Sequence, residues 1–205
     1  MKRRRFLQGL GVAGLGALAA AGYRYWPEAD WQNPCHAPTL PAALRDHPLI
    51  REAFAGIDFS QVWDTHVHLV GLGDSGGGIW INPAMHSLLH PVQYVQREFY
   101  LNAACASDTV GTVDDSYTAR LRTLAAGFPA GFKLMLYAFD RYYDATGQPR
   151  PALSQFYVPN RTVAEVARLA PQQFEWVASI HPNRRDWQEA LDSCKAAGAR
   201  GVKWL

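Results

Sequence analysis

Cysteine, net charge and long apolar runs are all scarce in this sequence, and each shortage excludes a class of protein. The three cysteines, Cys35, Cys105 and Cys194, stand far apart, and none belongs to a C-x-x-C pair. Their odd number and wide spacing argue against a disulfide framework or a thiolate zinc site. Cys105 and Cys194 fall on predicted helices, where we expect them to fill the core. A formal charge of +2, without a concentrated basic face, argues against a nucleic-acid partner.

The N-terminus holds the one dense basic run, residues 2–5, which is followed by 9–22, a stretch of Gly, Ala, Leu and Val alone. A charged start before a modest apolar run is typical of an export signal, which we assign to residues 1–22. Residues 3–8, Arg-Arg-Arg-Phe-Leu-Gln, resemble the twin-arginine pattern, which implies the Tat export machinery as a partner and a periplasmic or exported location. The alternative is an uncleaved membrane anchor, although the run is shorter than the roughly 20 residues of a spanning helix.

The remaining chain divides near residue 60. Residues 23–60 are a proline-rich lead-in with a short helix expected near 42–54, and residues 61–205 form one predicted domain. Within it, short and continuous apolar runs predict buried strands, which lie at 61–70, 131–140, 174–182 and 201–205.

Helices are predicted between these strands. Pro91 opens the first, which carries Val92, Val95 and Phe99 at helical spacing. A second follows a capping box over 112–115, a third is capped by Asn160, and a fourth runs over 187–198. Strands that alternate with helices in this way predict an α/β fold with parallel βαβ units.

The most informative stretch is Asp64-Thr65-His66-Val67-His68, inside the first predicted strand. Residues of like parity share one face of a strand, so Asp64, His66 and His68 are expected on a common face. Two imidazoles at this spacing can reach one cation, and Asp64 is a weak ligand or the acceptor of a histidine ring N–H. The alternative is a pair of surface histidines on an edge strand.

Other polar residues stand where the later strands end. Asp140 follows the second strand, His181 ends the third and Lys203 lies in the fourth. Parallel sheets place their active sites at this edge. The glycine-rich loop over 71–83 directly follows the histidine pair, and we expect it to be a mobile cover over a site.

These features resemble the amidohydrolase superfamily, and specifically its amidohydrolase-related branch. The motif over 64–68 carries the resemblance, and residues 179–182 and 198–204 support it. The resemblance implies a metal-dependent (β/α)8 TIM barrel, of which residues 61–205 would be the N-terminal half, truncated at the fourth strand, because such a barrel takes about 250 residues. We expect this fragment to be inactive alone.

The resemblance also implies the site. His66 and His68 would bind a divalent metal, most often zinc, as one or two ions, and Lys203 is a candidate carboxylated ligand or a substrate contact. Asp64 and Asp140 would support the site or face substrate. His181 matches no ligand of the family, and it either faces substrate or caps its strand. The general-base aspartate is expected beyond residue 205, so no catalytic residue is assigned within the chain.

The implied activity is that of a hydrolase in which metal-activated water attacks an amide, ester or lactone carbon of a small molecule. A metal-dependent decarboxylase of the same branch is the first alternative, and a metal-dependent deoxyribonuclease a more remote one. A non-catalytic binding protein on the same barrel is the alternative outside enzymes.

Overall fold

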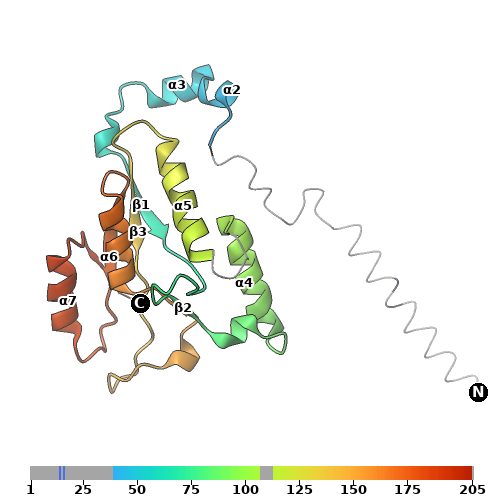
Figure 1. Ribbon diagram of the computed structural model, residues 1–205, viewed down its shortest axis with the longest axis vertical. Coiled ribbons are helices and arrows are strands. Elements are labelled where there is room, and N and C mark those ends of the chain that lie inside the picture. Colours follow the sequence, from blue (N-terminus) through green and yellow to red (C-terminus); the bar gives the residue numbers. More distant parts are fainter. Residues whose placement is uncertain (1–13, 15, 17–38, 107–112, 205) are drawn as a thin grey trace, which may run out of the picture. The chain divides into compact units, whose positions relative to one another are not determined.

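The computed structural model describes residues 14, 16, 39–106 and 113–204 (Figure 1). The chain divides into two compact units, Met1–Pro34 and Cys35–Leu205. In the first unit Gly14 and Gly16 alone are described, both in helical conformation, so the rest of the export signal predicted over residues 1–22 lies outside the described residues. Across the described residues, no helix combines the length and the apolar character that crossing a membrane requires.

Four parallel strands form the main sheet, which confirms the predicted α/β class. The strands follow one another across the sheet in the order β1, β3, β5, β6. Their bounds are β1 Trp63–His68, β3 Lys133–Tyr137, β5 Phe174–Ser179 and β6 Val202–Lys203. A second, antiparallel pair, β2 Trp80–Ile81 with β4 Phe156–Tyr157, was not expected from the sequence.

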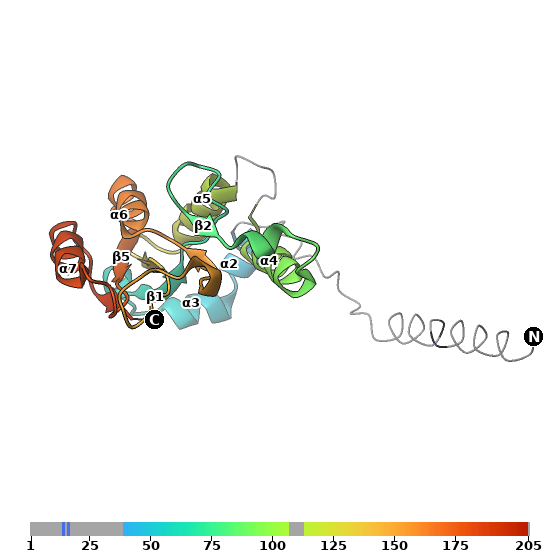
Figure 2. The same ribbon diagram turned by 90° about the horizontal axis from the view of Figure 1, so that it is seen from below.

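The predicted helices are all present, and three of them lie around one side of the main sheet (Figure 2). Those three are α5 Val113–Ala126, α6 Asn160–Leu169 and α7 Trp187–Ala196. The other helices are α2 Ala42–Arg45, α3 Pro48–Phe54 and α4 Pro91–Ala104, with short 3-10 turns η1 Phe59–Gln61, η2 Pro83–His86 and η3 Pro151–Leu153.

The hydrophobic core lies between the sheet and these three helices. On β3 and just beyond it, alternate residues Leu134, Leu136 and Ala138 are buried, and they belong to one cluster with residues of α5, α6 and α7. The intervening Met135 and Tyr137 are only half-buried on the opposite face. Strand alternation therefore gives the sheet one core face and one open face.

The apolar stripe predicted on α4 is present but does not face the core. Val92, Val95 and Phe99 are 75%, 59% and 67% exposed, whereas Leu101 is buried. The helix packs against η2 rather than against the main sheet. Helical spacing fixes which residues share a face, but the neighbouring elements decide which face is covered.

The predicted cap of the third helix needs correction. Asn160 is the first residue of α6 rather than its cap, which is Pro159. The Asn160 side chain instead holds both backbone groups of Ser179, at 2.8 and 3.0 Å, and so joins α6 to the end of β5.

The cysteines also differ from one another. Cys194 is a buried free thiol on α7, as expected of a core residue. Cys105, expected as a core filler, is half-buried beyond the end of α4 in a left-handed conformation and is disulfide-bonded to a partner outside the described residues.

Candidate functional site

A bulge in β1 shapes the candidate site. Trp63 and Asp64 pair with Lys133 and Leu134 of β3, but the pairing then resumes at Val67 with Leu136 and at His68 with Tyr137. Three steps along β1 therefore span two steps along β3. An extra residue in one strand of a pair shifts the register of the strand that carries it. The bulge lies at Thr65 and His66, inside the histidine motif.

Asp64 does not share a face with His68. The prediction that Asp64, His66 and His68 lie on one face is therefore wrong for Asp64. Asp64 is in register with Leu134, whose side chain is buried in the core, whereas His68 is in register with Tyr137 on the open face. The Asp64 carboxylate accepts a hydrogen bond from the backbone N–H of His66, at 3.2 Å, within the bulge. Strict alternation fails here because the extra residue reverses the parity.

The two histidine rings converge on the open face. Their Nε2 atoms lie 3.0 Å apart, and the ring centres are separated by 4.9 Å. Both rings lie beside Tyr137, at 4.9 Å for His66 and 6.0 Å for His68. Two ring nitrogens that point at one another across 3.0 Å can share a proton or bind a common cation.

Lys203 of β6 completes this cluster from across the sheet. Its Nζ lies 5.4 Å from the ring centre of Tyr137 and 5.1 Å from that of Phe139. Burial, followed by the positive charges of Lys203 and His66, lowers the pKa of His68 to about 4. Burial also lowers the pKa of Lys203. His68 is therefore neutral at pH 7, the form in which imidazole binds a metal.

The fit to a metal is partial. Over residues 39–106 and 113–204, no group of three or more His, Cys, Asp or Glu side chains gathers to hold an ion. The described nitrogen donors are His66 and His68, with the amine of Lys203 nearby. They suit a borderline-soft divalent cation such as zinc as part of a ligand set, since structural and catalytic zinc sites use at least three protein ligands.

Asp140 connects two strand ends instead of facing the histidine pair. Its buried carboxylate accepts hydrogen bonds from the backbone N–H of His181 at 3.0 Å, from Nη1 of Arg184 at 3.0 Å and from the N–H of Arg141 at 2.9 Å. Its own N–H donates to Ser179 Oγ at 2.9 Å. These bonds tie the residues after β3 to those after β5.

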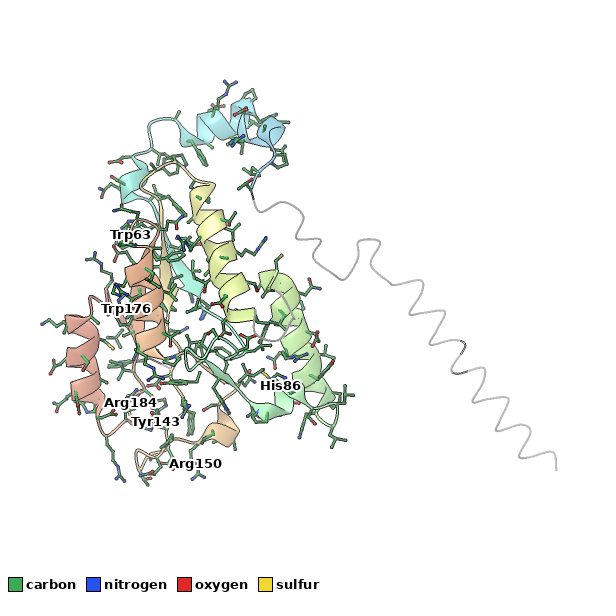
Figure 3. The ribbon with its side chains drawn as sticks, in the orientation of Figure 1. Trp63, His86, Tyr143, Arg150, Trp176 and Arg184 are labelled. Carbon is green, nitrogen blue, oxygen red and sulfur yellow. The ribbon has the colours of Figure 1, made fainter. Side chains whose placement is uncertain are left out.

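His181 is buried beside two tyrosines at the same edge. Its Nδ1 accepts the backbone N–H of Asn183 at 3.1 Å, so a neutral ring carries its proton on Nε2. Tyr142 and Tyr143 lie 5.5 and 5.6 Å from its ring centre. His181 and Asp140 line a cavity of about 260 Å³. Figure 3 shows Tyr143 beside Arg184, at the end of the sheet away from Trp63.

A larger cavity, of about 520 Å³, begins at His68. The glycine-rich loop forms one wall of it and is fastened to α5 by two carboxylates. Asp114 accepts the N–H groups of Leu72 and Gly73 at 2.8 and 3.1 Å, and Asp74 accepts the N–H groups of Val113 and Asp114 at 3.0 and 3.1 Å. These bonds join the loop to α5 in this conformation, and the expectation of a mobile cover stays a prediction. Thr112, the start of the predicted capping box, lies outside the described residues.

Sequence reasoning did not identify Tyr137 and Tyr117 as parts of the site. Tyr137 backs both imidazoles, and Tyr117 of α5 donates its hydroxyl to the carbonyl of His68 at 3.0 Å. The alternation of β3 could have identified Tyr137, because it places this residue on the opposite face from the buried Leu134 and Leu136. The contact of Tyr117 has no local signal.

No protein-family model, curated protein or solved structure matches this chain. The geometry of the site therefore carries the functional argument.

Proposed function

We propose that the chain belongs to a metal-dependent hydrolase of the amidohydrolase-related family and forms the N-terminal half of its (β/α)8 barrel. The observation that carries the proposal is the 3.0 Å approach of the Nε2 atoms of His66 and His68 on the open face of a parallel sheet. β1 is an edge strand of the described sheet and His66 is exposed, as the alternative of surface histidines expects, but the convergence of the two rings beside Tyr137 favours a shared cation.

The order of the strands supports the barrel. Each strand of the main sheet lies beside the next parallel strand in the chain, and helices cover one side. A (β/α)8 barrel has the same order, with helices outside and the other sheet face turned inward. His66, His68 and Lys203 would then lie toward the carboxyl ends of strands inside the barrel, the position of barrel active sites.

The side chains have separable roles in this reaction. His66 and His68 would hold the metal, and Lys203 would be a further ligand or a contact for an anionic group of the substrate. When bound, a divalent metal would acidify a water molecule and polarise a carbonyl group. Tyr137 lies beside both histidine rings, and Phe139 lies beside that of His68. By the resemblance, the general base would be an aspartate that this chain does not contain.

The disulfide at Cys105 supports the proposed export. Disulfides persist in oxidising compartments such as the periplasm and are rare in the cytosol. A twin-arginine signal over residues 1–22 would bring the folded protein to that compartment.

Metal content tests the proposal. Protein expressed from the complete reading frame is purified, loaded with zinc, desalted and analysed by mass spectrometry beside a His66→Ala, His68→Ala double variant and a His90→Ala control on an exposed histidine. We expect about one zinc per chain in wild type and control, and loss of that zinc in the double variant, because two of its ligands are gone. Equal zinc in all three proteins, or none in any, would contradict the proposal.

The reaction class needs a second assay. Amide, ester and lactone hydrolysis is measured beside carbon dioxide release from aromatic carboxylates, with protein from the complete reading frame. Hydrolysis that is lost in the double variant supports the proposal. Carbon dioxide release alone would favour the decarboxylase.

A further inference from the structure

We propose that the cavity of about 260 Å³ beside Asp140 is a binding site for a small monocarboxylate, which Arg141 and His181 hold by its carboxylate group. The site uses no metal and neither histidine of the pair over residues 66–68. It is therefore independent of the proposed function.

The guanidinium of Arg141 has no acceptor in the part of the chain that the structure describes. Its Nε is buried without a hydrogen-bond partner, and neither Nη atom forms a hydrogen bond or an ion pair with a described residue. Its backbone N–H alone is engaged, with the Asp140 carboxylate. Buried donors in native proteins are almost always paired, so an unpaired one points to an acceptor from solution.

Arg141 also carries a positive charge that pairs with no described carboxylate. Asp140 and Asp186, two carboxylates at this edge of the sheet, both pair with Arg184, at 3.0 and 2.7 Å. The Arg141 guanidinium instead lies over the ring of Tyr157, with its Cζ 4.3 Å from the ring centre. Stacking occupies the face of a guanidinium and leaves the N–H groups at its edge for an anion.

His181 supplies the second donor. This residue is 6% exposed and lines the same cavity as Arg141. Its Nδ1 accepts the N–H of Asn183, so the neutral ring carries its proton on Nε2, which has no partner among the described residues. A guanidinium and a ring N–H together suit one carboxylate, whose two oxygens accept from two donors.

The rest of the wall sets the size and character of the ligand. Phe139, Leu153 and Phe156 are apolar, and the Ser154 hydroxyl is already engaged with two backbone groups. The volume of about 260 Å³ lies just below the roughly 300–1,000 Å³ of typical small-molecule sites, so the ligand is small. A ring or short alkyl group on the carboxylate would gain burial against the apolar side chains.

The balance of charge favours a monoanion. Arg141 is the one unpaired cation described in the wall, and the Asp140 carboxylate lines the same cavity. A ligand with two negative charges would bring the second one toward this carboxylate, which repels it. The site should therefore bind benzoate better than phenyl phosphate, which carries nearly two negative charges at neutral pH.

Titration calorimetry with benzoate tests the site. Protein expressed from the complete reading frame is treated with a chelator, so that the carboxylate cannot coordinate a metal. We expect benzamide, which has a similar shape and no charge, and phenyl phosphate each to bind at least about tenfold more weakly than benzoate. In NMR spectra benzoate should shift the Nε–H signal of Arg141, which its loss in Arg141→Gln identifies.

Two variants with the same loss of charge separate this site from a general attraction to anions. Arg141→Gln should weaken benzoate binding at least about tenfold, whereas Arg185→Gln, at an exposed position outside the lining, should keep it within about twofold. His181→Asn removes the Nε2 donor and should weaken binding roughly fivefold. If Arg141→Gln does not fold, the comparison of benzoate with benzamide on the wild type decides.

Benzoate that does not bind the wild type, or that benzamide or phenyl phosphate equals, would overturn the inference. Unchanged affinity in folded Arg141→Gln would overturn it as well, as would loss of benzoate binding in the His66→Ala, His68→Ala variant. A protein that binds benzoate but takes up no zinc would refute the proposed function and leave this site standing. Zinc uptake without benzoate binding would do the reverse.

Discussion

The buried ion pair between Asp140 and Arg184 should carry a large share of the stability of this domain, and Arg184→Met tests it. The Asp140 side chain is 1% exposed and that of Arg184 is 16% exposed. Breaking a buried pair costs about 3–5 kcal/mol because a charge is left without its partner. Asp140 keeps two backbone N–H donors, so we expect the lower end of this range, about 3 kcal/mol.

Urea denaturation of wild type and variant measures this difference. Arg168→Met is the control, because Arg168 pairs with Glu165 in the open, at exposures of 68% and 52%, and its loss should cost far less than the loss of Arg184. The cost of Arg184→Met should also be nearly unchanged in high salt, since ions do not reach a buried pair. A loss equal to that of Arg168→Met, or one that salt removes, would refute the reasoning.

Three further perturbations address the site and its loop. The folded pKa of His68, about 4, lies below the ordinary 6.5, so the unfolded chain binds more protons than the folded chain between these two pH values. The free energy of unfolding should therefore fall by about 1 kcal/mol as the pH drops from 6.5 to 4. An NMR titration of the His68 ring with a midpoint near pH 6.5 would contradict this. Gly73→Ala should cost more than about 2 kcal/mol in thermal or urea unfolding, since a Cβ there would lie 2.2 Å from the Ile79 carbonyl oxygen at a φ of +87°. Gly56→Ala, with a similar φ of +75° and open space around it, should cost about 1 kcal/mol, and it measures the cost of the positive φ without a steric clash. Tyr117→Phe should cost about 1 kcal/mol and speed amide exchange at the end of β1, and unchanged exchange would show that the hydroxyl does not hold the strand.

The parallel sheet and its helices were predictable because apolar runs and helical spacing are local signals. The buried alternation of Leu134 and Leu136, the start of α4 at Pro91 and the end of α5 before Gly127 all follow from neighbouring residues. The face of α4 was not predictable, because its covering partner is η2, an element with no apolar period of its own. The pairing of β2 with β4 joins segments some 75 residues apart and likewise leaves no local trace.

The candidate site was predictable in its residue types but not in its geometry. The sequence shows two histidines separated by one residue, and their convergence with Lys203 near Tyr137 requires the register of four strands. Asp64 illustrates the limit. Ideal alternation places it with the histidines, yet one extra residue in β1 turns it to the other face. A bulge depends on the pairing with a partner strand, so no pattern within β1 could have revealed it.

The bulge also gives the histidine pair its geometry. In a regular strand, residues two positions apart are separated by about 6.5–7 Å, and their side chains stand roughly parallel. The Nε2 atoms of His66 and His68 instead lie 3.0 Å apart, and the register of β1 is irregular at this point of the strand. The N–H of His66, which a regular ladder would pair with β3, is satisfied by the Asp64 carboxylate. The bulge therefore removes Asp64 from the face of the histidine pair. Asp64 instead holds the bulge through this hydrogen bond, so it positions His66, whereas strand alternation predicted a metal ligand.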